Sequence, residues 1–549
     1  MKRKSGVLAV GCLLLASGAL LIAQPHSPPT AAAKETTAEA LFRTADGCLA
    51  CHNGLVGPAG EDISIGLDWR PSMMANSARD PYWQAAVRRE TTDHPEAASA
   101  IEHECSACHM PMTRYAAKVA GKRGAVFANL PITTQETPEG LLAADGVSCT
   151  SCHQILRERL GTRDSFTAGF VIDTSLPYGR REVFGPFTVK PGLETLMRSA
   201  ADFTPAEASH LASAEMCATC HTLYTHALGP GGEAIGQLPE QVPYLEWRHS
   251  SYREEKTCQD CHMPVVQRPV PIASVLGEPR EGFSRHEFRG GNFYMPRILN
   301  RYGADLGAAG LPTELDAAGN RAAEHLRSEA ARLRIDWSER ADGRLGAEVV
   351  LENLAGHKLP TAYPSRRSWI HFTVRDASGR LVFDSGAFQP SGAITGNDND
   401  VDPARFEPHY TEISAEDQVQ IYEVIMGDAG GNVTTGLLKG VRYIKDNRVP
   451  PRGFDKETAD KDVAVYGDAS SDADFTGGGD RVRYLVDTRS AKGPFHLHAE
   501  LWYQPIGFRW ARNLEAYQQQ PEPARFVRFY DETASSTAMV IARASAKTR

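Results

Sequence analysis

The sequence predicts a fold in two parts, an α-rich, loop-rich N-terminal domain followed by a β-sandwich-like C-terminal domain. Two observations lead to this division of the 549 residues. Between residues 48 and 262 the pattern Cys-x-x-Cys-His occurs five times, among turn-rich stretches with few apolar residues. After about residue 334, short segments of alternating apolar and polar residues are joined by Gly- and Asp-rich turns, which is typical of a β-sandwich.

The five motifs predict five covalently attached haem c groups. Two thiols three positions apart can add to the two vinyl groups on one porphyrin edge, and the histidine that follows can then bind the iron as proximal ligand. Disulfides, zinc knuckles and thioredoxin-like pairs need no such histidine. The predicted thioether cysteines are Cys48, Cys51, Cys105, Cys108, Cys149, Cys152, Cys217, Cys220, Cys258 and Cys261, and the predicted proximal ligands are His52, His109, His153, His221 and His262. The N-terminal part is therefore predicted to be a pentahaem c-type cytochrome domain.

The first 33 residues have the form of an export signal and linker. Lys2, Arg3 and Lys4 precede an apolar run at 7–23, and a polar, proline-containing stretch follows it. The run is slightly short for a membrane span, so cleavage is favoured and no transmembrane span is expected in the mature chain. The signal predicts a periplasmic or cell-surface protein, where haem is attached to such motifs.

The cytochrome domain is predicted to occupy residues 34–311. A short helix is expected near Asp80-Pro81, because Ser77 and Asp80 can cap a helix and proline is tolerated in its first turn. The gaps between motifs are irregular, which argues against a solenoid. Because the long loops carry few apolar residues, the porphyrins must supply much of the buried surface, and this domain is not expected to fold without haem.

A helical connector is predicted at 312–333, with Thr313 as its N-cap, and the β-sandwich-like domain at 334–549. Strands are expected at 345–353, 369–376, 381–384, 418–425, 481–487 and 495–503. In the last of these, Leu497, Leu501 and Tyr503 share one face, while His496 and His498 share the other. The two histidines are therefore expected on an exposed strand face.

Each predicted iron has a sixth coordination position, and twelve histidines remain outside the signal and the motifs. His286 is a candidate distal ligand because the glycines after it allow the backbone to pass close to a porphyrin. His210 lies seven residues before the fourth motif, and His357 lies in a Gly- and Pro-flanked loop at a strand end. Two imidazoles favour low-spin electron transfer, whereas an open position allows substrate binding.

Other kinds of site receive little support. Two acidic stretches, at 397–402 and 468–480, have the oxygen-rich composition of calcium loops, so a structural calcium ion is a candidate cofactor. Neither has the EF-hand spacing, and solvated turns are the alternative interpretation. The net charge of -9 without a long basic run excludes nucleic acid as an expected partner. No nucleotide-binding loop or nucleophile elbow is apparent.

The N-terminal half resembles the multihaem cytochromes of the cytochrome c-552/c-554 domain family, in the wider group that includes hydroxylamine oxidoreductase and pentahaem nitrite reductase. The resemblance rests on Gly-Val-Ser-Cys-Thr-Ser-Cys-His at 146–153, Phe-Gly-Pro-Phe at 184–187, Cys-Ala-Thr-Cys-His-Thr at 217–222 and Thr-Cys-Gln-Asp-Cys-His-Met-Pro at 257–264. It implies proximal ligation by the five motif histidines and supports His286 and His357 as distal ligands.

The C-terminal half looks like a β-rich module found fused to such cytochromes, through Gly-His-Lys-Leu-Pro-Thr at 356–361 and Lys-Asp-Asn-Arg at 445–448. The chain departs from the enzymatic relatives in two ways. Nitrite reductases have lysine in place of the catalytic proximal histidine, and hydroxylamine oxidoreductases carry more haem motifs. Both departures weaken the case for catalysis.

Three functions remain after the sequence is considered. The leading hypothesis is an exported pentahaem electron carrier that passes electrons through closely packed haems between redox protein partners, without catalytic residues. The alternative is a multihaem oxidoreductase that acts on a small nitrogen or sulfur compound at one five-coordinate haem. In the third, the β-domain binds another component of a periplasmic or cell-surface complex. The carrier is favoured because the chain has enough histidines to supply a sixth ligand to every iron.

Overall fold

A computed structural model describes residues 41–176, 179–339 and 342–548. All of these residues belong to one compact unit that spans residues 37–549. The predicted export signal and linker at 1–33 lie outside the described residues. In the described ranges, no helix combines the length and the apolar character needed to cross a membrane.

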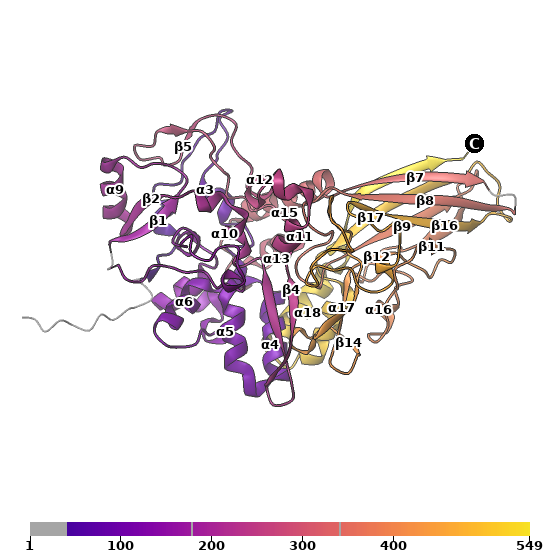
Figure 1. Cartoon of the computed structure of the whole chain (residues 1–549), viewed down its shortest axis with the longest axis horizontal. Coiled ribbons are helices and arrows are strands. Elements are labelled where there is room, and N and C mark those ends of the chain that lie inside the picture. Colours follow the sequence, from indigo (N-terminus) through magenta and orange to yellow (C-terminus); the bar gives the residue numbers. More distant parts are fainter. Residues whose placement is uncertain (1–40, 177–178, 340–341, 549) are drawn as a thin grey trace, which may run out of the picture. The chain divides into compact units, whose positions relative to one another are not determined.

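The part of the chain up to residue 311 consists of short helices, long loops and three two-stranded sheets (Figure 1). The helices are α2 Asp46–Leu49, α3 Ile65–Trp69, α4 Pro81–Asp93, α5 Ala98–His109, α6 Pro111–Val119, α7 Pro138–Ala144, α8 Cys149–Cys152, α9 Pro191–Ala201, α10 Ala214–Ala218, α11 Pro243–Arg248, α12 Cys258–His262, α13 Tyr294–Arg301 and α14 Gly303–Leu306. The sheets pair β1 Arg181–Gly185 with β2 Phe203–Glu207, β3 Leu223–Leu228 with β4 Ala234–Gln241, and β5 Val270–Pro271 with β6 Pro279–Arg280.

The helix predicted at Asp80-Pro81 is confirmed as α4, which is longer than expected. The Asp80 carboxylate accepts hydrogen bonds from the amides of Tyr82 and Trp83, and Pro81 occupies the first helical position. This helix packs against α5, which ends at the second motif. The N-cap of α4 therefore stabilises the start of a helix that packs against the helix of the second motif.

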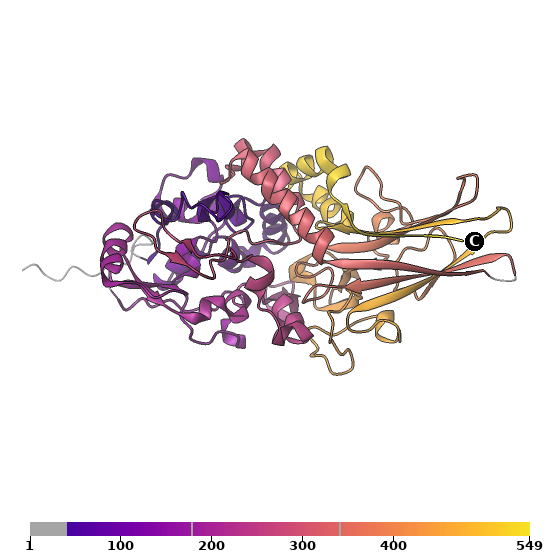
Figure 2. The ribbon, with the colours of Figure 1, turned by 90° about the horizontal axis from the view of Figure 1, so that it is seen from above.

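The segment that was predicted as a connector forms α15, Pro312–Glu329, and Figure 2 shows this helix leading from the N-terminal helices to the first long strand. Thr313 is not the N-cap: Leu311 precedes the helix, and its amide donates to Glu314 Oε2 at 3.0 Å. The prediction that the helix extends to residue 333 is also wrong. From Ala331 the chain pairs with the next strand, and this pairing overrides the helical composition.

Two larger sheets face each other in the C-terminal part (Figure 1). One has the order β10-β9-β17-β18, with β12 also paired to β9, and the other has the order β11-β16-β8-β7. Their bounds are β7 Ala331–Glu339, β8 Arg344–Asn353, β9 Arg367–Arg375, β10 Leu381–Ser385, β11 Glu412–Ile413, β12 Ile421–Tyr422, β16 Gly479–Asp487, β17 His496–Gln504 and β18 Met539–Lys547. Phe372 of β9 stacks on Tyr484 of β16 with ring centres 4.2 Å apart, so the inner faces share one core.

Further short elements complete this part. A third sheet joins β14 Val433–Thr434, β13 Val424–Gly427 and β15 Arg442–Asp446, and the helices are α16 Asp398–Val401, α17 Phe508–Arg512 and α18 Pro521–Thr533. The predicted strands at 345–353, 369–376, 381–384, 481–487 and 495–503 are confirmed as β8, β9, β10, β16 and β17. The segment 418–425 is instead divided between β12 and β13, which belong to different sheets. His498 is exposed and His496 half-buried, opposite buried Leu497.

One buried core continues across the predicted domain boundary. Helix α18 packs on α4: Phe526 lies with its ring centre 5.0 Å from that of Tyr82, and Arg88 forms an ion pair with Glu522 at 2.7 Å. Tyr294 of α13 also hydrogen-bonds to Thr533 at 2.6 Å. The limits of the domains remain predictions, but the two parts are held together by apolar and polar contacts.

Candidate functional site

The ten motif cysteines are half-buried, and several of them lie next to a cysteine of another motif. The sulfur atoms of Cys48 and Cys149, of Cys108 and Cys220, and of Cys217 and Cys258 are neighbours, close enough for each to shift the pKa of the other. The thiol of Cys152 is also close enough to Cys220 to raise its pKa, although burial has the larger effect. The first motif therefore adjoins the third, and the fourth adjoins the second, third and fifth.

Four of the five motif histidines are held in the tautomer that a metal requires. Nδ1 of His52 lies 2.6 Å from the main-chain carbonyl oxygen of Ile272, and Nδ1 of His109 lies 2.8 Å from that of Ser77. Nδ1 of His153 lies 2.6 Å from the carbonyl oxygen of Phe184, and Nδ1 of His262 faces that of Arg289. A carbonyl oxygen only accepts, so each Nδ1 carries the proton and donates it. Each Nε2 then keeps a free lone pair, as in histidines that bind metals.

Burial keeps three of these imidazoles neutral, those of His109, His153 and His262. It lowers the pKa of His109 to about 4 and also lowers the pKa values of His153 and His262. A neutral imidazole is the form that binds a metal, so the residues fit the predicted role. His221 differs from the other four in one respect: no carbonyl acceptor for its Nδ1 is found among the residues that the structure describes. Desolvation by the surrounding protein lowers its pKa to about 4, as for His109.

His286 lies opposite the third motif histidine, as a distal ligand would. Its ring centre is 6.4 Å from that of His153, and the ring planes differ by 19°. Two imidazoles that bind opposite sides of one metal, each at about 2.0 Å, have ring centres about 6 to 6.5 Å apart. Burial lowers the pKa of His286 to about 3. The pair therefore has the spacing and the charge state of two ligands to one iron.

His357 has the same relation to the fifth motif. Its ring centre lies 6.3 Å from that of His262, with an angle of 12° between the planes, and its Nδ1 faces the carbonyl of Lys358 at 3.0 Å. Burial lowers the pKa of His357 to about 4. A residue of the C-terminal part thus faces the last motif in the geometry expected of a distal ligand.

A second ring near His262 was not singled out from the sequence. His325 of α15 has its ring centre 5.9 Å from that of His262, at an angle of 60°. Its Nδ1 lies 3.7 Å from the Glu329 carboxylate, whereas Nδ1 of His357 has a carbonyl acceptor at 3.0 Å. The His325 ring is tilted by 60°, whereas that of His357 is nearly parallel to the His262 ring. His357 therefore matches the pattern of the motif histidines better. Only the position of α15, which depends on long-range packing, brings His325 to this site.

The third predicted distal ligand, His210, is buried beside the third motif. Its Nε2 donates to the carbonyl of Ile155 at 2.7 Å, and its ring lies 5.3 Å from that of Phe184. This leaves Nδ1 as the nitrogen able to bind a metal. No motif histidine is in ring contact with His210 among the described residues, so its role as a ligand stays a prediction.

Trp83 is a further contact that the sequence did not indicate. Its ring stacks on His109 with centres 4.2 Å apart and planes within 2°. Trp83 belongs to the first turn of α4, whose N-cap is Asp80. The stacking and the bond from Nδ1 to Ser77 together fix the orientation of the His109 ring.

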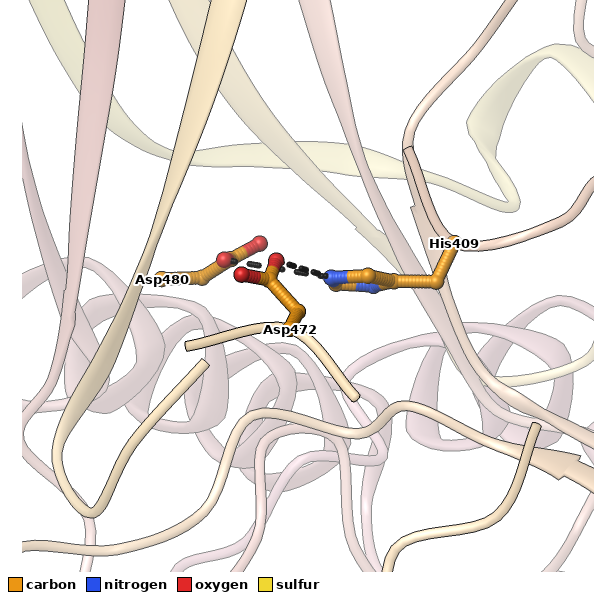
Figure 3. A group of neighbouring side chains, drawn as sticks. All are labelled: His409, Asp472 and Asp480. Atoms are coloured by element: carbon orange, nitrogen blue, oxygen red, sulfur yellow. Dashed lines mark hydrogen bonds and ion pairs between the residues drawn. The ribbon is translucent and has the colours of Figure 1, made fainter. Parts of the chain in front are cut away.

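The second acidic stretch contributes to a buried polar cluster (Figure 3). Nε2 of His409 lies 3.0 Å from Asp472 Oδ2 and 4.0 Å from Asp480 Oδ1. Nδ1 of His409 accepts hydrogen bonds from the side-chain amides of Gln420 at 2.9 Å and Asn447 at 3.1 Å. Main-chain contacts fix both amides, because Gln420 Oε1 accepts from Tyr410 and Asn447 Oδ1 accepts from Glu423.

This arrangement gives His409 a proton on Nε2, which it donates to Asp472, so that nitrogen has no lone pair for a metal. Asp480 accepts from the Tyr422 hydroxyl at 2.7 Å and from the Arg481 amide at 2.7 Å. In the first acidic stretch, Asp400 forms a buried ion pair with Arg367. The predicted calcium ion therefore stays a prediction, without a structural observation that favours it.

Comparisons with known proteins identify a fold but no family. No family model matches the chain, and no curated protein matches it. The structure is similar to that of a penta-heme cytochrome c552 from Thermochromatium tepidum, with a TM-score of 0.51 and 16% sequence identity. The similarity covers 92% of this chain and 99% of that one, so it includes the strand-rich C-terminal part. The chain therefore has a multihaem cytochrome fold.

Proposed function

We propose that the protein is an exported pentahaem c-type cytochrome that transfers electrons through closely packed haems between redox protein partners. The observation that carries this proposal is the contact between cysteines of different motifs, which links all five motifs into one connected group. Haem bound at adjacent motifs supplies one-electron chemistry at iron, and short distances between neighbours favour transfer.

The positions of the histidines support six-coordinate iron at two motifs. The proposed pairs are His153 with His286 and His262 with His357, whose ring spacings fit one shared iron. The ten motif cysteines would form the thioether bonds. Two imidazoles per iron favour low-spin electron transfer over substrate binding.

The proposal includes the family and the location. The motif sequences are consistent with the cytochrome c-552/c-554 domain family, fused to a β-rich module that carries His357. The basic and apolar N-terminus is consistent with export to the periplasm or cell surface. Partners are proposed to be redox proteins, because electron transfer through the haems needs an electron donor and an electron acceptor.

An oxidoreductase acting on a small nitrogen or sulfur compound is the second candidate. One observation favours it: among the described residues, no second histidine ring is in ring contact with His52, His109 or His221, unlike His153 and His262. An iron held by such a histidine could keep an open sixth position.

Electron paramagnetic resonance of the oxidised holoprotein tests the two candidates. Spectra would be recorded alone and with nitrite, hydroxylamine or sulfite. The carrier is expected to give low-spin signals that do not respond to these compounds. A high-spin signal that shifts with one compound would contradict the carrier and assign the substrate class of an enzyme.

A further inference from the structure

A buried ion network lies beside the loop that carries His357. Lys358 Nζ is 2.8 Å from Asp446 Oδ2, Arg448 binds both oxygens of Asp446 at 2.8 and 2.9 Å, and Arg448 Nη1 is 2.9 Å from Glu246 Oε1. The side chains of Lys358, Asp446, Arg448 and Glu246 are 0%, 2%, 6% and 0% exposed. The network thus holds two positive and two negative charges away from solvent.

Such a network is a poor source of stability by itself. Removing a charged group from water costs several kcal/mol. Replacing a buried ion pair by apolar residues of similar volume therefore often leaves the folding stability unchanged or raises it. Buried ions instead fix the relative positions of the elements that carry them. Here Glu246 belongs to α11 in the N-terminal part, whereas Asp446 ends β15 in the C-terminal part.

The element held most tightly is the loop at 356–361. Glu246 Oε2 accepts from the amide of Lys358 at 3.1 Å and from the hydroxyl of Thr361. Asn353 Nδ2 donates to the carbonyl of His357 at 2.9 Å. Leu359 forms two main-chain hydrogen bonds with Val449, each of 2.9 Å. The loop backbone is therefore fixed at three successive residues, 357 to 359, and the Thr361 side chain adds one more contact.

The His357 imidazole has little support of its own. Its hydrogen bond goes to the carbonyl of Lys358, within the same loop. The direction of the ring toward His262 is thus set by the loop backbone. Glu246, Asn353 and Val449 hold that backbone, and Asp446 holds the side chain of Lys358. A shift of the loop would move the ring away from the iron position between the two histidines.

We propose that Glu246, Asp446 and Arg448 are positioning residues, which act through the loop to keep His357 bound opposite His262. The inference rests on the proposed function, because it assumes haem at the fifth motif. In this arrangement the contact between the N- and C-terminal parts determines whether the fifth iron is six-coordinate. The network itself touches neither the iron nor a substrate.

The test compares three variants of the haem-loaded full chain. Asp446→Asn weakens the network, and His357→Ala removes the ligand and sets the full effect. Asp400→Asn is the matched control: Asp400 is also 2% exposed and binds Arg367 through both oxygens, at 2.7 and 3.0 Å, without contact to this loop. Haem content, high-spin fraction and carbon monoxide bound per chain are measured for each.

With haem content unchanged, D446N and H357A are expected to bind about one more carbon monoxide per chain than the wild type, with a matching high-spin signal, because one iron loses its sixth ligand. D400N should equal the wild type. If D446N behaves like the wild type while H357A gains a site, the inference is overturned and the proposed function stands. If H357A gains no site, the ligand assignment fails and the inference fails with it.

A milder variant covers the case in which D446N does not fold. Thr361→Val removes one hydrogen bond to Glu246 and leaves all charges in place. Its high-spin fraction is expected to lie between those of the wild type and H357A. A value equal to that of the wild type would overturn the inference for this loop.

Discussion

A main-chain carbonyl faces Nδ1 in four of the five motif histidines, and this contact has two effects. It fixes the proton on Nδ1, and it fixes the rotation of the ring about its bond to the chain. The acceptors lie outside the motifs: Ser77 in a 3-10 turn before α4 serves His109, and Phe184 of β1 serves His153. Ile272 and Arg289, in loops after the fifth motif, serve His52 and His262. Segments outside the motifs therefore have a defined role, which is to orient the motif histidines.

Replacement of His286 by Ala tests the distal pair at the third motif. The five haems should be retained, because the thioether bonds are untouched, while one iron changes from low spin to high spin and binds about one carbon monoxide per chain. Absorption and paramagnetic resonance spectra would show this change. His498→Ala, on the exposed face of β17, is the control and should leave the spectra unaltered. An H286A spectrum identical to that of the wild type would exclude His286 as a ligand.

At the scale of single elements, α4 combines a structural and a functional role. Its first turn carries Trp83, which stacks on His109, and its N-cap is the buried carboxyl of Asp80. Burial raises the pKa of Asp80 to about 6, although the hydrogen bonds from the amides of Tyr82 and Trp83 oppose this shift. Ionisation of the Asp80 carboxyl therefore lowers the free energy of unfolding.

The pH dependence of Asp80→Asn follows from this shift. The folded state binds the Asp80 proton more tightly than the unfolded state does, where the pKa is near 3.8, so this residue favours folding less as the pH rises from 4 to 7. Asn keeps the cap acceptor and does not ionise. Between pH 4 and pH 7 the free energy of unfolding of D80N should rise by about 2 to 3 kcal/mol relative to the wild type. Denaturant titrations at both pH values measure it, and a constant difference would refute the assignment.

The elements differ in how far the sequence could predict them. The start of α4 is a local signal, because cap and proline act within one turn. Strands β7 and β18 were not predicted, because their Ala- and Arg-containing sequences also suit a helix and their state depends on pairing with β8 and β17. His357 was predicted from its Gly- and Pro-flanked loop. His325 and Trp83 were missed, since only tertiary packing brings them to the motifs.

At the scale of the whole molecule, the two parts depend on each other. Helix α18 of the C-terminal part lies on α4 of the N-terminal part, and Glu246 enters the ion network of the C-terminal part. The sequence indicated two domains because motifs and strands occupy separate stretches. It could not show the shared core, which forms between residues several hundred positions apart.

Expression of residues 334–549 alone tests this dependence. The fragment lacks Glu246, so Arg448 loses one buried partner, a change that typically costs about 3 to 5 kcal/mol. It also exposes the face of α18 that carries Phe526, which is fully buried in the whole chain. Limited proteolysis and circular dichroism should show an unstable or aggregated fragment. A cooperative, protease-resistant fragment would instead support an independent binding module.

The bond between His52 and Ile272 joins residues 220 positions apart, and it has a consequence for how the protein matures. A chain that emerges from its N-terminus presents the first motif long before the carbonyl that orients His52 has been made. Under the proposed function, attachment at Cys48 and Cys51 then takes place while that imidazole still rotates freely. The first motif would thus be loaded early and reach its final ligand geometry late, only when the segment after the fifth motif returns to it.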